Sequence, residues 1–147
     1  MLWAVRPLTE ADVDDVCAVF RRSRASAMPW LPVLHTPDED RRFFANEIAT
    51  SEGWAVDPAG VLLGFALRRE GWLNHLYVDP PSWRAGVGRE LLARAARDVA
   101  VGLDLWVFQR NAAARAFYVE QRFVEVERTD GRGNEEREPD IRMRWAG

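Results

Sequence analysis

Apolar positions along the chain change their spacing several times, and each spacing predicts a type of element. Val13, Val16 and Phe20 recur every three to four residues, which predicts a helix with one buried face. Runs rich in β-branched and aromatic residues predict strands, because such residues suit a pleated, half-buried surface. The predicted strands are 2–6, 52–56, 61–69, 72–78, 103–108, 123–128 and 141–145.

Four helices are predicted between these strands. Thr9 with Asp12 has the residue types of a helix cap, and Thr36 with Pro37 and Glu39 repeats that pattern. The predicted helices run from 9 to near 24, from 36 to beyond 48, from 84 to near 100 and from 111 to near 121. The element order is therefore β-α-α-β-β-β-α-β-α-β-β. A helical crossover joins strand 72–78 to strand 103–108, so these two strands should run parallel.

Composition narrows the class of protein. The net charge is −3 over 147 residues, so no basic field suggests nucleic acid. Every one of the 20 basic residues is arginine, which excludes a Walker-type phosphate loop and a lysine Schiff base. The lone Cys17 excludes an intrachain disulfide and a cysteine-based metal cluster, and no metal site is expected. Without a signal peptide or a membrane-spanning apolar run, we expect one cytoplasmic domain over residues 1–147.

One loop stands where a strand gives way to a helix. The residues 79–82, with two prolines, stop the strand, and helical spacing begins beyond Gly88. The first N–H groups of a helix lack internal partners and carry partial positive charge, and glycine lets an anion approach them. Arg84 and Arg89 add charge at the edges. The loop is either a phosphate site or a tight turn that needs glycine for shape alone.

Two groups of residues carry a resemblance to a known family. The strand end Val78-Asp79-Pro80 is followed by Gly86-Val87-Gly88. The second group is Asn111, Ala114, Phe117 and Tyr118. With the element order, these residues resemble the GNAT superfamily of acyl-CoA-dependent N-acetyltransferases over nearly the whole chain. Two positions depart from its pattern: Trp83 stands where Gln or Arg is usual, and Arg122 where Gly is usual.

The resemblance implies a fold and argues against a competitor. It implies an α/β (α+β) GNAT fold, a mixed sheet of about seven strands with four helices, splayed between the fourth and fifth strands. A dinucleotide-binding fold would also use Gly-x-Gly. That fold needs the loop in an early β-α-β unit and a small residue at position 91, which is Leu91 here.

The resemblance also implies the cofactor and the residues around it. Acetyl-CoA (coenzyme A) is the expected cofactor, with its pantetheine arm lying in the gap between the fourth and fifth strands. The N–H of Leu76 would face the thioester oxygen, and Tyr118 would protonate the departing thiolate. The implied cofactor-binding residues are Leu76, Tyr77, Val78, Arg84, Ala85, Gly86, Val87, Gly88, Arg89, Asn111, Ala114, Arg115, Phe117 and Tyr118.

The proton acceptor and the amine site are less determined. His75 and His35 are candidate bases, and a water chain or an acceptor arriving neutral are the alternatives. The acceptor side should combine the loop 28–35, the second helix and the loop 130–140. The residues predicted to bind the acceptor are Trp30, His35, Glu135 and Glu136. The acidic loop has a plainer interpretation as an ordinary solvated hairpin loop.

The function that these expectations support is acetyl transfer from acetyl-CoA to a primary amine of a small molecule. The expected partners exclude nucleic acid and membrane, and the family resemblance allows a homodimer. Two alternatives stay open. One is a non-catalytic module that binds or senses acyl-CoA, and the other is an acetyltransferase that acts on a protein amine.

Overall fold

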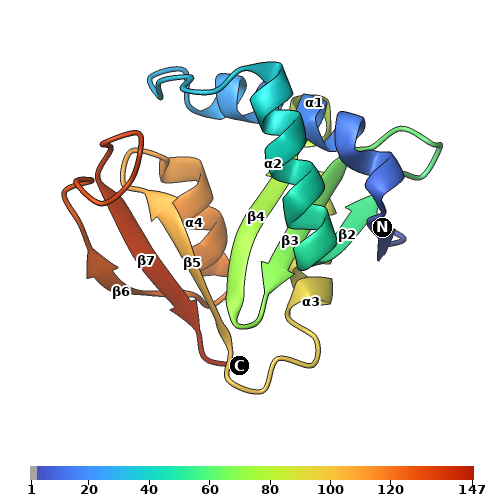
Figure 1. Ribbon diagram of the computed structural model, residues 1–147. Coiled ribbons are helices and arrows are strands. Elements are labelled where there is room, and N and C mark those ends of the chain that lie inside the picture. The colour runs from blue at the N-terminus through green and yellow to red at the C-terminus, as the bar shows by residue number, and fades with distance from the viewer. Residues whose placement is uncertain (1–2) are drawn as a thin grey trace.

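The centre of the molecule is a seven-stranded mixed sheet with the strand order β1-β2-β3-β4-β5-β7-β6 (Figure 1). The structure, a computed structural model, describes residues 3–147. The strands are β1 (Arg6–Pro7), β2 (Glu52–Val56), β3 (Gly64–Arg69), β4 (Trp72–Val78), β5 (Leu103–Phe108), β6 (Val124–Arg128) and β7 (Asp140–Trp145). The helices are α1 (Val13–Ala27), α2 (Pro37–Thr50), α3 (Val87–Ala95) and α4 (Ala112–Glu120).

The element order and the fold class match the prediction. The strands β4 and β5 are parallel, as the helical crossover required. The predicted caps are present: the Asp12 carboxylate accepts from the Thr9 N–H, and Thr36 exchanges hydrogen bonds with Glu39. None of the helices within residues 3–147 has the length and apolar character needed to cross a membrane.

Several predicted bounds are wrong. Strand β1 is Arg6–Pro7 rather than 2–6, and residue 2 of that prediction lies outside the described residues. Strand β3 starts at Gly64 rather than at 61, and α1 continues to Ala27. Helix α3 is much shorter than 84–100 because left-handed residues bound it. The φ angles of Arg84 and Gly86 are +61° and +86°, and that of Asp98 is +59°, which no helix accommodates.

Two hydrophobic cores lie on opposite faces of the sheet. Helices α1 and α2 cover one face, where Val16, Phe44 and Phe65 are completely buried. Helices α3 and α4 pack on the other face, around Leu91, Leu105 and further apolar residues. On α2, Phe44 faces this core, whereas the adjacent Phe43 is 49% exposed at the helix edge. The two cores hold the helices against the sheet, and this packing determines where the edges of the strands between them lie.

The sheet opens between β4 and β5. These strands pair only at Trp72 and Asp104, whereas β5 pairs with β7 along its whole length. Beyond that single pair they diverge, as Figure 1 shows for the upper part of the sheet. The predicted splay is therefore present, and beyond Trp72 it leaves this edge of β4 unpaired with β5.

Candidate active site

The edge of β4 presents backbone groups to the gap. The N–H of Asp79 donates to the carbonyl of Leu63 at 2.7 Å, which sets the register of the β3–β4 ladder. In that register the N–H and C=O of Val78, and of Leu76 two residues earlier, point away from β3. The groups of Tyr77 point toward β3 instead. Since β5 has diverged here, Leu76 offers a free main-chain donor and acceptor to an extended ligand.

Trp83, the departure from the family pattern, has a structural task at this edge. Its indole Nε1 donates to the carbonyl oxygen of Val78 at 2.7 Å, and its ring is 41% exposed. That bond occupies one lone pair of the carbonyl and leaves the other, because a backbone oxygen can accept twice. The indole therefore fixes the end of β4 relative to the loop that leads into α3.

Helix α3 begins without a side-chain cap. Gly86 occupies the cap position with φ of +86°, and no side chain within residues 3–147 bonds the first N–H groups of the helix. By contrast, Thr36 caps α2 and Asn111 caps α4 through the N–H of Ala114. An uncapped helix start leaves its amides and its partial positive charge for an external anion. Trp3 holds the loop from below by donating its Nε1 to the Ala85 carbonyl at 2.7 Å.

Other predicted cofactor residues surround this helix start. Arg84 and Arg89 are exposed at its edges, and Val87 is buried beneath it. A Cβ built on Gly88 would lie 3.6 Å from the Phe117 ring, so α3 and α4 meet there. Arg115 donates to the Gln109 carbonyl at 3.0 Å and lies 3.5 Å from Glu125. Arg115, one of the implied cofactor-binding residues, is thus held beside β6.

Tyr118 stands on α4 where the gap begins. Its ring packs edge-on against Phe117 and Phe123, at centroid distances of 5.2 and 5.4 Å. Burial raises the pKa of its hydroxyl well above the ordinary value, and the neighbouring Tyr77 adds to that rise. Tyr77 reaches the same region from the opposite face, where it packs against Phe20 at 5.1 Å. Burial raises the pKa of the Tyr77 hydroxyl as well, so both phenols stay protonated at neutral pH.

The two candidate bases lie in different places. His75 is nearly buried between α2 and β4, where its Nε2 lies 3.1 Å from Glu47 and its ring packs on Phe44. Its Nδ1 is buried and has no hydrogen-bond partner among the described residues. His35 is exposed, and its Nε2 lies 2.9 Å from Glu135, which raises the pKa of the imidazole. The structure does not bring the two histidines together.

The predicted acceptor loops meet over the open end of the gap. The Trp30 ring packs under the Arg110 guanidinium at 4.1 Å and edge-on against Phe108 at 6.2 Å. Arg24 Nη2 lies 3.2 Å from Glu136 Oε2. These contacts join the α1–α2 loop to β5 and join α1 to the β6–β7 loop. All four predicted acceptor residues (Trp30, His35, Glu135 and Glu136) take part in contacts of this kind.

Sequence reasoning missed three side chains of this region. Arg24 and Phe20 were assigned only to the end and the buried face of a helix, and Glu47 was not singled out. The signal for Arg24 was its position four residues after Phe20, which places both on one face of α1. That signal was lost because the helix was predicted to end near residue 24.

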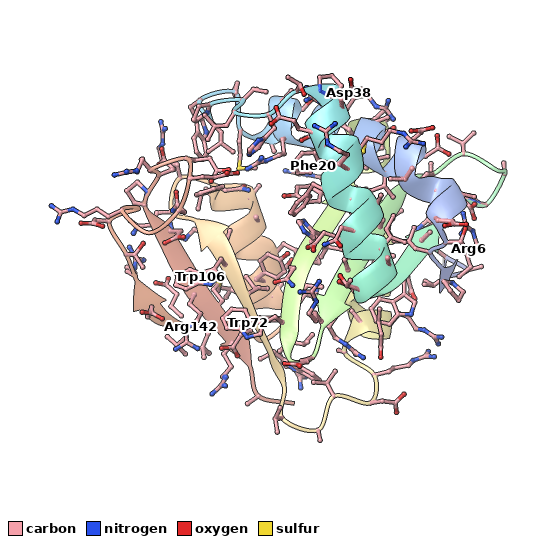
Figure 2. The ribbon with its side chains drawn as sticks, in the orientation of Figure 1. Arg6, Phe20, Asp38, Trp72, Trp106 and Arg142 are labelled. Carbon is pink, nitrogen blue, oxygen red and sulfur yellow. The ribbon has the colours of Figure 1, made fainter. Side chains whose placement is uncertain are left out.

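Two cavities flank the joined loops. The first, of about 470 Å³, is lined by Phe20, Arg24, Met28, Leu31, His35 and neighbouring residues, and we call it the loop cavity. The second, of about 460 Å³, is lined by Trp106, Phe108, Asn134, Glu136, Asp140 and neighbours, and we call it the strand cavity. In Figure 2, Phe20 lies near the upper end of the gap and Trp106 on the side of β5 and β7.

The fold has a diverging pair of parallel strands, and an uncapped helix starts after the first of them. A phenol lies at the gap between the strands. Together these features define a class of protein. The family model described as the acetyltransferase (GNAT) family matches residues 15–123, most of the chain. The chain therefore belongs to the GNAT family of N-acetyltransferases. No curated protein matches it in sequence.

Solved structures show the same fold over essentially the whole chain. The apo form of YjaB from Escherichia coli has a TM-score of 0.81 at 21% identity, covering 100% of this chain and 99% of that one. The PaiA N-acetyltransferase of Thermoplasma acidophilum, in complex with coenzyme A, has 0.77 at 20%, covering 99% and 100%. The ribosomal-protein-S18-alanine N-acetyltransferase of E. coli has 0.75 at 22%, covering 97% and 92%.

Proposed function

We propose that this protein transfers an acetyl group from acetyl-CoA to the primary amine of a small molecule. The observation that carries the proposal is the conjunction of free backbone groups on β4 with an uncapped α3 start at the end of the same strand. An extended amide-bearing arm needs the first and a diphosphate needs the second. PaiA, which shares this fold, was solved with coenzyme A, and that supports the assignment.

Each group of the chain has a proposed task in binding. The N–H groups of α3 hold the diphosphate, and Arg84 and Arg89 add long-range attraction. The C=O of Leu76 and the free lone pair of Val78 pair with the pantetheine amides, and the N–H of Leu76 faces the thioester oxygen. Tyr77, Asn111, Ala114, Arg115 and Phe117 stay proposals as cofactor contacts, with Asn111 also serving as the cap of α4.

The chemical step is an amine attack on a thioester that bound acetyl-CoA supplies. A C–N bond forms and the C–S bond breaks, so negative charge passes from the carbonyl oxygen to the sulfur. The N–H of Leu76 stabilises the oxygen charge, and the Tyr118 phenol donates a proton to the thiolate. The raised pKa of Tyr118 suits this task because the phenol stays protonated at neutral and alkaline pH.

The amine also has to lose a proton. His75 is half of a buried pair with Glu47, and it reaches the amine only from the face of α1 and α2. His35 stands at the entrance with Glu135. We propose that either histidine, or a water chain between them and the gap, takes this proton.

A thiol-release assay with acetyl-CoA and a panel of small amines tests the proposal. We expect thiol release that depends on the amine and an equal amount of acetylated product by mass spectrometry. Coenzyme A should also raise the melting temperature, since it binds only the native state. Cofactor binding without turnover on any amine would favour a non-catalytic acyl-CoA module. Mass shifts on a partner protein without turnover of free amines would favour a protein acceptor.

A further inference from the structure

One ion pair stands where an acceptor would have to enter. Arg24 lines the loop cavity, Glu136 lines the strand cavity, and their charged atoms meet 3.2 Å apart. Their side chains are only 23% and 10% exposed. Both charges lie close enough to the buried Tyr77 hydroxyl to act on its pKa, in opposite directions. The pair therefore stands between the two cavities, near the Tyr77 phenol.

The pair leaves binding capacity unused. Arg24 makes one contact to Glu136, while its Nε is buried and has no hydrogen-bond partner within residues 3–147. Its guanidinium lies 5.0 Å from the centre of the Phe20 ring, which holds the plane in place. A guanidinium so placed can still grip a carboxylate with two parallel bonds. A single-contact buried ion pair is also weak grounds for stability, because desolvation offsets the attraction.

The charge balance of the pair selects the acceptor. A ligand with only an ammonium would take Glu136 and leave Arg24 buried and unpaired, and a ligand with only a carboxylate would do the reverse. Leaving one partner of a buried pair uncompensated is costly. A zwitterion replaces both partners at once, so neither charge is left alone. The loop cavity beside Arg24 is walled by Phe20, Met28 and Leu31, which suits an apolar side chain.

We infer that the acceptor is a free α-amino acid with an apolar side chain, its ammonium on Glu136 and its carboxylate on Arg24. This inference rests on the proposed function and narrows its substrate class. Without the acceptor, Arg24 and Glu136 satisfy each other and close the passage between the cavities. The acceptor exchanges these partners, and its ammonium then releases its proton to the histidine or water chain proposed above.

Matched pairs of acceptors test the inference on the wild-type protein. L-leucine and isoamylamine share the side chain and the amine, and only leucine has the carboxylate. Because the leucine carboxylate would make charge-assisted hydrogen bonds, we expect kcat/KM to be roughly 10- to 100-fold higher for leucine than for isoamylamine. Equal or better use of isoamylamine, or of leucinamide and an N-terminal leucyl peptide amide, would overturn the inference while leaving acetyl transfer intact.

Variants separate recognition from a merely structural contact. Arg24→Gln should raise the KM for leucine by roughly 10- to 100-fold and leave isoamylamine little changed. Glu136→Gln should weaken both acceptors. Arg41→Gln, which removes an exposed ion pair with Asp14 on the outer side of α1 and α2, is the control and should change neither. An equal loss for both acceptors in Arg24→Gln would mean that the pair only fastens the loops, and would contradict the inference.

Binding measurements keep the two proposals distinguishable. If no amine releases thiol, the proposed function fails, and calorimetric titration of leucine still decides the recognition. Leucine binding that is present in the wild type and lost in Arg24→Gln supports the inference. The absence of leucine binding, with coenzyme A bound or not, overturns it.

Discussion

At the scale of single residues, Tyr118 has the clearest chemical role to test. Tyr118→Phe removes the proton donor and keeps the ring that packs between Phe117 and Phe123. We expect kcat to fall by at least about tenfold, because general acid assistance to the thiolate is lost. Coenzyme A affinity, measured by titration, should change little. Steady-state kinetics with an unaltered kcat would show that Tyr118 is only an aromatic packing residue.

Arg122 carries the second residue-scale prediction. Its φ is +72°, its N–H donates to the Val119 carbonyl, and the N–H of Phe123 donates to that of Tyr118. This is the glycine-favouring end of a helix, occupied here by an arginine. Arg122→Gly should therefore stabilise the fold by about 0.5–1 kcal/mol in denaturant unfolding, since left-handed backbone strains other residues. Arg97→Gly, beside α3 in an ordinary conformation, should not stabilise.

At the scale of elements, alanine variants can distinguish the proposed diphosphate site at the start of α3 from the general effect of backbone strain. Gly86 at φ +86° and Gly60 at φ +76° both need the left-handed conformation, and neither has a crowded Cβ position. Alanine at either position should lower the melting temperature, because the strain is the same. Only Gly86→Ala should also shrink the further rise that coenzyme A produces, since it tilts the amides that face the diphosphate.

Differential scanning fluorimetry with and without coenzyme A measures both effects of these alanine variants. Gly60 lies in the turn between β2 and β3, so Gly60→Ala reports strain alone. An undiminished coenzyme A response in Gly86→Ala would contradict a diphosphate site at α3. A diminished response in both variants would mean that general destabilisation, rather than the site, controls the shift.

The elements were predictable from sequence where local chemistry determines them. The caps at Thr36 and Thr9, the strand β5 and the parallel β4–β5 relation follow from residue types and spacing. The end of α3 was not predictable, because Ala96 to Ala100 is still helix-compatible and Asp98 turns left-handed only in the folded chain. Phe43 has the right spacing for the core and is exposed because α2 is rotated toward Phe44.

The candidate site divides in the same way. Its proposed cofactor half lies within one contiguous stretch, 76–89, and in the helix that follows β5, so sequence motifs could suggest it. Its acceptor half joins residues more than a hundred positions apart, as with Arg24 and Glu136. A lone arginine on a helix and a glutamate in a charged loop give no local signal that they meet. Only the packing of the two loops over the gap produces the pair.

At the scale of the whole molecule, the splayed sheet makes two arms that are joined at both ends. At the base, Trp72 pairs with Asp104, and the Asp104 N–H donates to the Gly71 carbonyl at 2.8 Å. At the open end, the loops are joined through Arg24 and Glu136 and through His35 and Glu135. The base is joined by backbone hydrogen bonds and the open end by side chains, so access to the gap should respond to side-chain charge.

The His35–Glu135 contact makes this closure depend on pH. Glu135 raises the pKa of His35 above its ordinary value, so folding favours the charged imidazole. The resulting stabilisation is complete below the ordinary histidine pKa and is lost as the pH rises through the raised one. Hydrogen exchange of the amides in residues 129–138 is measured at low salt and at a series of pH values, in the wild type and in His35→Gln. Exchange should be faster in the variant only at pH values below this window. A difference that is independent of pH, or that grows as pH rises, would show that His35 joins the loops by packing rather than by charge.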